Sequence, residues 1–184
     1  MREIADAADL SAANLYHYFN GKTDLLFYCQ DRALDRMLDA VASARRSSSS
    51  ATECLRLVFS AHVHTLLDDI EGATAHLHIE SLPPALWTAI VKKRDRYEHA
   101  LRRVITAGVR SGELVDMNPA IVARAMLGAM NWTVTWFRPD GADTASTVGE
   151  VISRFLVRGI ASRTPAARRT LSVMTSKPSK GPTR

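Results

Sequence analysis

Residues 1–26 read MREIADAADLSAANLYHYFNGKTDLL, and the spacing of their apolar side chains predicts two short helices joined by a tight turn. Ala5 is small, so the two helices can cross closely there. Ser11 precedes the second helix and can cap it by accepting a hydrogen bond from a free backbone N–H. Leu25 and Leu26 begin a third helix. The predicted inward positions are Ile4, Ala5 and Ala8 in the first helix and Leu15, Tyr18 and Phe19 in the second, with Leu10 in the turn between them.

The polar side chains of this stretch are predicted to point outward. A short helix, a tight turn and a second helix form the unit that lays a helix in the major groove of DNA. A helical hairpin with no role in DNA binding is the alternative, but it gives no reason for the polar residues on the outer face. The predicted DNA-binding residues are Ser11, Ala12, Asn14, Tyr16, His17 and Lys22, of which Tyr16 and Lys22 are expected on phosphates.

The stretch resembles the tetracycline-repressor-like (TetR-type) regulators. Asp9 stands where that family usually has glycine, and we expect a left-handed backbone there, which Asp tolerates better than most residues. The segment LYHYFNGK, residues 15–22, is the most diagnostic part. The matching residues are Ile4-Ala5, Ala8-Asp9-Leu10-Ser11, Leu15-Tyr16, Tyr18-Phe19, Lys22 and Leu25.

The resemblance implies a three-helix DNA-binding domain whose first helix precedes this stretch. Two interpretations stay open: Met1 is an internal methionine of a longer protein, or the chain is a truncated regulator. Residues 1–28 have a net charge of −2, because two basic residues stand against four acidic ones. Neutralisation of phosphates supplies much of the affinity for DNA, so this segment offers little electrostatic attraction. The truncated form would be a ligand-binding dimer that does not bind DNA by itself.

The basic character of the chain comes from its C-terminal tail. The 184 residues carry a formal net charge of +5, but residues 163–184 hold six basic side chains and no acidic one. This Ser/Thr/Pro/Lys-rich tail is predicted to be disordered, either attracting DNA weakly or only solubilising the chain. No apolar run approaches the roughly 20 residues of a membrane span, and no secretion signal opens the chain, so we expect a cytoplasmic protein.

Hydrophobic periodicity predicts an all-α fold. Beyond residue 22, helices are expected over residues 23–44, 52–69, 72–80, 85–110, 119–137 and 144–162, with Asn118 as a cap. We predict a partial helix-turn-helix domain over residues 1–28, a helical effector-binding and dimerisation domain over 29–162, and the disordered tail over 163–184.

The last two helices are predicted to form the interface of a homodimer. An apolar stripe runs from Val148 to Ile160 at helical spacing, and Ala125, Gly128 and Ala129 form a small-residue groove. Two such helices from each subunit would make a four-helix bundle about a two-fold axis, although the stripe could also pack only within one subunit. The predicted interface residues are Trp132, Val148, Ile152, Phe155, Leu156 and Gly159.

Large apolar side chains, with a few polar ones, lie between these two regions. The TetR resemblance implies a pocket here for a small hydrophobic effector, whereas plain core packing is the alternative for each residue. Residues 132–160 also resemble the C-terminal part of repressors of lipid and sterol breakdown that respond to acyl-CoA thioesters. Lys92, Lys93 and Arg94 would then meet CoA phosphates, or form a solvated helix face. The predicted effector-binding residues are Phe59, His62, Leu66, Trp87, Tyr97, Met126, Met130 and Asn131.

Neither H-x-H pair of the sequence chelates a metal by itself; a site shared by His76 and Glu80, four residues apart, with His62 is the alternative. In His62-x-His64 and His76-x-His78, residues two apart on a helix point about 200° apart around its axis. We expect no metal, no cofactor and no enzyme activity, since no nucleophile elbow, phosphate loop or paired catalytic carboxylates are found. The sequence therefore predicts a ligand-responsive dimeric repressor that reads a palindromic operator through residues 11–22 and is released by an effector, with an acyl-CoA as candidate.

Overall fold

The computed structural model describes residues 1–7, 9–68 and 81–162 of the chain. Within these ranges every helical or extended element except one isolated bridge, between Leu114 and Ala161, is an α-helix, which confirms the predicted all-α class. The predicted helix over residues 72–80, with His76 and His78, and the basic tail lie outside the described residues. The helices are α1 (Arg2–Ala7), α2 (Ala12–Tyr18), α3 (Lys22–Ser47), α4 (Ala51–Asp68), α6 (Pro84–Ser111), α7 (Pro119–Asn131), α8 (Thr133–Trp136) and α9 (Ala145–Ile160).

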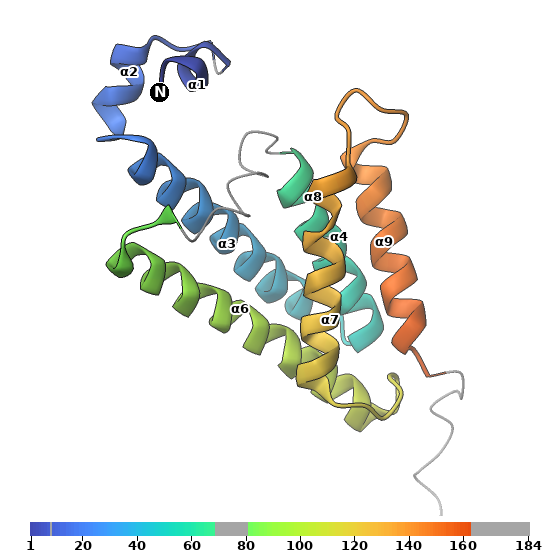
Figure 1. The fold of residues 1–184 in the computed structure, drawn as a ribbon. Coiled ribbons are helices and arrows are strands. Elements are labelled where there is room, and N and C mark those ends of the chain that lie inside the picture. Colours follow the sequence, from blue (N-terminus) through green and yellow to red (C-terminus); the bar gives the residue numbers. More distant parts are fainter. Residues whose placement is uncertain (8, 69–80, 163–184) are drawn as a thin grey trace, which may run out of the picture.

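Helix α4 is the central element of the larger unit. It packs against α3, α6, α7 and α9, while α3 and α6 also run side by side (Figure 1). The small unit of α1 and α2 lies at the N-terminal end of α3 (Figure 1). Since α3 is continuous from Lys22 to Ser47, the predicted domain boundary at residue 28 falls inside a helix. The helix that leaves the N-terminal unit is thus also a wall of the larger one.

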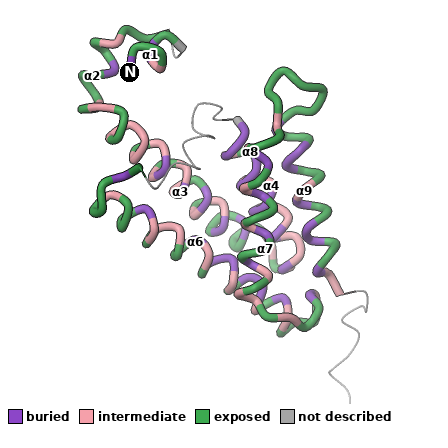
Figure 2. The backbone as a smooth tube through the Cα atoms, in the orientation of Figure 1, coloured by how far each residue is buried: buried purple, intermediate pink, exposed green. Residues whose placement is uncertain are grey.

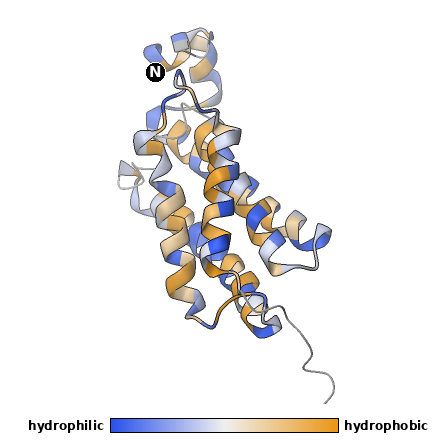
Figure 3. Cartoon of the chain, turned by 90° about the vertical axis from the view of Figure 1, so that its right-hand side faces the viewer, coloured by the Kyte–Doolittle hydropathy of each residue, from blue (hydrophilic) through white to orange (hydrophobic). Residues whose placement is uncertain are grey.

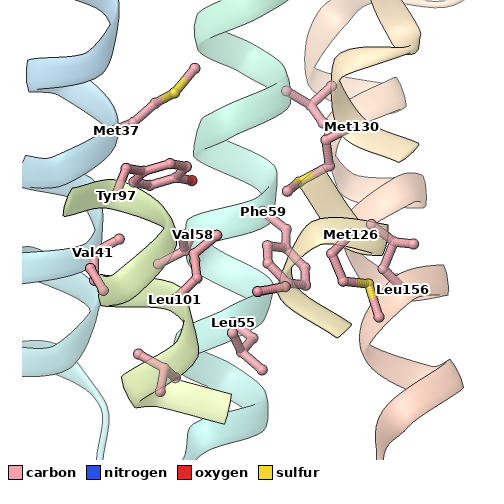
Figure 4. Packing of buried hydrophobic residues seen from close by; sticks show 14 of the residues in the cluster. Met37, Val41, Leu55, Val58, Phe59, Tyr97, Leu101, Met126, Met130 and Leu156 are labelled. Atoms are coloured by element: carbon pink, nitrogen blue, oxygen red, sulfur yellow. The ribbon is translucent and has the colours of Figure 1, made fainter. Parts of the chain in front are cut away.

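The main hydrophobic core surrounds α4. Leu55, Val58 and Phe59 of that helix are fully buried, together with Leu101 of α6 and Met130 of α7 (Figure 4). Buried segments alternate with exposed ones along each long helix, as expected for amphipathic helices that share one core (Figure 2). Burial of such large side chains supplies most of the favourable free energy of folding.

The N-terminal unit follows the sequence prediction closely, with one exception. Ser11 caps α2 by accepting a 3.1 Å hydrogen bond from the backbone N–H of Asn14, and Asp9 has the expected left-handed backbone, with φ of 54°. Ala5 and Leu15 are buried in one small cluster, also as predicted. The prediction that Tyr18 faces inward is wrong: it is 70% exposed, because α2 ends at this residue and Phe19 is the next to turn inward.

The end of α7 departs from the predicted boundary. Asn118 caps α7 and Pro119 begins it, as expected, but the helix ends at Asn131 and a separate short helix, α8, follows. The hydroxyl of Thr133 donates to the carbonyl oxygen of Met130 over 2.7 Å, and that of Thr135 to Trp132 over 2.6 Å. Such side-chain bonds compete with the regular helical ladder, which accounts for the break.

We expect Gly108→Ala in α6 to destabilise the protein by about 1–3 kcal/mol, the usual cost of overpacking a core. A Cβ atom at this position would lie 2.6 Å from the side chain of Leu114 and 2.8 Å from the Cβ of Ala51. Urea unfolding monitored by circular dichroism measures this decrease in the free energy of unfolding. The double variant with Leu114→Ala should lose less than the two single variants added together, because the new methyl group partly fills the space. Strict additivity would contradict this explanation.

Candidate functional site

Helix α2 presents the predicted DNA-binding residues on the outside of the N-terminal unit. Ser11, Asn14, Tyr16, His17 and Lys22 are all exposed. The sixth, Ala12, is half-buried against the small cluster around Leu15, so its role is to seat α2. The side chains of Asn14 and Tyr16 have no hydrogen-bond partner within the described residues and stay available to a ligand.

A cavity of about 120 Å³ lies between four helices of the larger unit. Its lining combines apolar side chains with charged and hydrogen-bonding ones, the composition typical of sites for small organic ligands. The lining residues are Leu34 and Met37 of α3, His62 of α4, Arg94, Asp95, Tyr97 and Glu98 of α6, and Leu127 and Asn131 of α7.

Three of these residues form a chain of hydrogen bonds across α6, α4 and α7. The Nδ1 atom of His62 lies 3.0 Å from the Tyr97 hydroxyl, and its Nε2 atom lies 3.0 Å from the amide oxygen of Asn131. An amide oxygen can only accept, so Nε2 carries the proton of the imidazole and donates it to Asn131. Nδ1 is then the acceptor, and the hydroxyl of Tyr97 donates to it. We refer to Tyr97, His62 and Asn131 as the polar chain.

Burial keeps the polar chain uncharged. Desolvation lowers the pKa of His62 to about 4, although the bond to Asn131 acts in the opposite direction, and it raises the pKa of Tyr97. The imidazole and the phenol are therefore both neutral at pH 7. Both ring nitrogens of His62 are occupied by hydrogen bonds, which leaves neither to bind a metal ion.

Two of the charged lining residues, Glu98 and Arg94, have partners outside the cavity. Burial by itself would raise the pKa of Glu98, but hydrogen bonds and charge from Arg102 and Arg124 lower it overall. An Nη atom of Arg94 donates to the side-chain oxygen of Gln30 over 3.3 Å. The carboxylate of Glu98 is thus held in its ionised form, and Arg94 is held against α3.

Lys93, the neighbour of Arg94, ties α6 to α3. Its ammonium group forms ion pairs with Asp31 and with Asp35, the latter at 2.8 Å. Burial lowers the pKa of Lys93, but the bonds to the two aspartates outweigh that effect and raise it. Lys93 is therefore neither a solvated side chain nor free to meet a phosphate, whereas Lys92 is exposed on α6. The cavity sits directly beside the contact between α6 and the helix that follows α2.

Only part of the predicted effector set lines this cavity. His62, Tyr97 and Asn131 do, and the structure joins them by hydrogen bonds. Phe59, Leu66, Met126 and Met130 are buried in the main core instead, which favours core packing for these four. Trp87 is 43% exposed near the start of α6 and does not line this cavity, so its role in effector binding stays a prediction. Leu34 and Met37 of α3 were not among the predicted effector-binding residues, because apolar periodicity does not show which apolar residues of a helix line a cavity shared with other helices.

The predicted dimer residues separate into two rows on α9. Val148 and Leu156 are buried against α4 within one protomer, so the prediction that they face a partner subunit was wrong. Their row lies next to Gly149, where a Cβ atom would be 3.1 Å from the backbone oxygen of Ser60 in α4. Ile152 is half-buried at the edge of the same core.

The described residues leave the outer row of α9 uncovered. Val151 and Phe155 are 58% and 70% exposed, Gly159 continues their row, and Trp132 at the end of α7 is 66% exposed. Hydrophobic segments on this side of the molecule are visible in Figure 3. Large exposed apolar side chains gathered in one region mark a surface that binds another molecule. Val151 is the residue that the predicted interface set lacked.

Comparison with known proteins assigns both the N-terminal unit and the larger helical unit to one family. Residues 48–160 match the family profile described as "Tetracyclin repressor-like, C-terminal domain", and residues 1–29 match that described as "Bacterial regulatory proteins, tetR family". The chain belongs to the TetR family. It is a transcriptional regulator with an N-terminal helix-turn-helix unit and the C-terminal helical domain of this family. Within the described residues, no helix combines the length and apolar character needed to cross a membrane.

Individual TetR-family proteins share the greater part of the chain. The HTH-type transcriptional repressor KstR2 of Rhodococcus jostii (strain RHA1) is 24% identical over 88% of this chain and 81% of its own length. The crystal structure of the regulator PfmR from Thermus thermophilus is 31% identical, with a TM-score of 0.74 over 85% of this chain and 86% of that one. The structure of AibR in complex with isovaleryl coenzyme A and operator DNA has 25% identity and a TM-score of 0.66, over 85% and 83% of the two chains.

Proposed function

We propose that this protein is a homodimeric repressor, acting in the cytoplasm, that binds operator DNA through α2 and is released by an acyl-CoA. The cavity beside the α3–α6 contact carries this proposal, because it joins a place for a ligand to the helix that follows α2. AibR, a structural relative, is described in complex with both isovaleryl coenzyme A and operator DNA. The cycle consists of binding and release and includes no catalytic step.

Because the cavity is small, a ligand that enters it has to displace helices, and this displacement couples ligand binding to DNA binding. Ligand sites typically measure about 300–1,000 Å³, whereas this one measures about 120 Å³. An acyl chain therefore has to move α3 and α6 apart to enter, since the core around them is densely packed. Helix α3 begins at Lys22, directly after α2, so its displacement moves α2. A ligand that favours the displaced state shifts the protein away from DNA.

Titration of the protein–DNA complex with acyl-CoAs tests the proposal. Duplexes selected from a random pool by the purified protein supply the operator, and gel mobility shifts follow the complex as isovaleryl-CoA or octanoyl-CoA is added. We expect at least one acyl-CoA to release the DNA, while free CoA at the same concentration does not. Complexes that persist with both thioesters would contradict the acyl-CoA assignment.

The charge of the N-terminal unit favours a second candidate function. With a net charge of −2 over residues 1–28, this segment attracts phosphates weakly, so the chain could act as a ligand-binding dimer that does not bind DNA by itself. Calorimetric binding of an acyl-CoA combined with failure to select any duplex would favour this second function over the first.

Tyr16→Phe is expected to weaken DNA binding by a similar factor on every duplex. The Tyr16 side chain is exposed on α2, and a hydroxyl bound to phosphate contributes to affinity but not to sequence selection. Loss of one hydrogen bond to a charged group corresponds to roughly tenfold weaker binding. Fluorescence anisotropy with the selected operator and a scrambled duplex measures both affinities. Tyr28→Phe on α3 is the matched control, and unchanged binding by Tyr16→Phe would remove Tyr16 from the DNA contacts.

A further inference from the structure

We propose that Asn131 recognises the carbonyl oxygen of the ligand's thioester, and that His62 and Tyr97 hold the Asn131 amide in position for this contact. The inference rests on the proposed function and goes beyond it, because it names the ligand group and the residue that select for a thioester. Three features of the cavity carry it: the direction of the hydrogen bonds, the charge of the lining, and the apolar side chains that complete the lining.

The hydrogen bonds of the polar chain all run in one direction. Tyr97 donates to His62, and His62 donates to the amide oxygen of Asn131. The oxygen of Asn131 is therefore occupied, and the orientation of its amide group is determined. The amide nitrogen, with two N–H groups, has no hydrogen-bond partner among the described residues. In this arrangement Asn131 offers the cavity a donor, which a ligand meets with an acceptor such as a carbonyl oxygen.

The polar chain also strengthens that donor. Consecutive hydrogen bonds polarise one another, so donation from His62 to the amide oxygen makes the amide N–H groups better donors. Because Tyr97 and His62 are both buried, the chain has no bulk water to compete for its bonds. Asn131 is the member at the end of α7, half-buried, where a ligand in the cavity can reach it.

The charge of the lining favours a neutral acceptor over a carboxylate. Arg94 contributes one positive charge, while Asp95 and Glu98 contribute two negative charges. The guanidinium of Arg94 is already turned toward Gln30 of α3. Glu98 is already paired with Arg102 and Arg124, and Arg94 is bonded to Gln30. These lining residues are therefore already engaged and are not set up to neutralise the carboxylate of a free fatty acid, whereas a thioester carbonyl carries no charge to neutralise. The same acyl group attached to CoA is thus preferred to the free acid.

Apolar side chains supply the place for the acyl chain. Leu34 and Met37 of α3 and Leu127 of α7 complete the lining around the polar chain. Methionine adapts its shape to irregular ligands, because its side chain is unbranched and flexible. The cavity volume of about 120 Å³ favours short acyl groups over long ones.

A pair of CoA derivatives that differ by one oxygen atom tests the inference. Isovaleryl-CoA carries the thioester carbonyl, and in the corresponding thioether a methylene group replaces it. We expect isothermal titration calorimetry to show that the wild-type protein binds the thioester roughly tenfold more tightly than the thioether. Isovalerate together with free CoA should not bind measurably. Equal affinities of the wild-type protein for the two derivatives would overturn the inference without any variant.

Asn131→Asp then assigns the contact to one residue. This substitution keeps an oxygen that accepts from His62 and removes both N–H donors of the amide. Its added charge also repels the partly negative carbonyl oxygen of the thioester but not the methylene group of the thioether, so we expect the affinity ratio to fall to one or below. A tenfold ratio that persists in Asn131→Asp would overturn the role of Asn131.

Tyr97→Phe tests the positioning role of the chain. It removes only the hydroxyl that orients His62, and the affinity ratio should fall between those of the wild type and Asn131→Asp. A ratio equal to that of the wild type would restrict the inference to Asn131 and overturn the role given to Tyr97. Absence of binding by both CoA derivatives would instead refute the acyl-CoA function itself, which separates the two failures.

Discussion

Phe155→Asp is expected to convert the dimer into monomers and, with it, to abolish tight operator binding. Phe155 is 70% exposed on the outer row of α9, beside Val151, and the described part of its own protomer leaves it uncovered. A two-fold interface repeats each residue, so one substitution introduces two carboxylates. An unpaired charge in an apolar interface costs about 3–5 kcal/mol, which raises the dissociation constant by a factor of roughly 100 to 1,000 or more.

Sedimentation velocity measures the dissociation of the dimer directly, and fluorescence anisotropy with labelled operator DNA measures the resulting loss of DNA binding. A protein that reads two half-sites needs both subunits, so the monomer should lose most of its operator affinity. Ala89→Asp is the matched control, because it adds the same charge at an exposed position of α6. Circular dichroism should show both variants folded. A Phe155→Asp variant that still sediments as a dimer would move the interface away from the outer row of α9.

Acidification below pH 6.5 is expected to destabilise the protein through His62. The folded state holds the pKa of this imidazole at about 4, whereas its ordinary value, which applies to the unfolded chain, is 6.5. Between these values the unfolded state binds a proton that the folded state does not, so stability falls as the pH falls. Each pKa unit corresponds to about 1.4 kcal/mol, which gives a loss of about 2 kcal/mol between pH 6.5 and pH 5. Above pH 6.5 this contribution is fully present and constant.

Urea unfolding at a series of pH values measures the slope, with His62→Gln as the control that cannot titrate. Glu53, Glu98 and Glu113 also have lowered pKa values, but their contributions are lost only below their ordinary value of 4.5. The range from pH 6.5 to pH 5 therefore reports mainly on His62. Equal slopes for the wild type and His62→Gln would show that the imidazole is not buried in its neutral form.

Acidification should also act on the ligand site, because His62 connects Tyr97 with Asn131. A protonated imidazole donates from both nitrogens and can no longer accept a hydrogen bond from the hydroxyl of Tyr97. Protonation of His62 should therefore lower both the stability of the protein and its affinity for the ligand.

Local features of the fold were predictable from the sequence. The cap at Ser11, the left-handed backbone at Asp9 and the start of α7 at Asn118 each depend on hydrogen bonds or steric limits within about four residues. The all-α class and most helix ranges follow for the same reason, since apolar periodicity is a local property. The family resemblance of residues 15–22 likewise lies in one continuous stretch.

Tertiary structure alone decided which apolar row of α9 is buried and which side chains meet in the cavity. Val148 and Phe155 belong to the same stripe in the sequence, and only the position of α4 separates the buried row from the exposed one. His62 meets Tyr97, 35 positions away, and Asn131, 69 positions away. No periodicity encodes such pairs, because they depend on how three helices pack, and packing is set by the whole core.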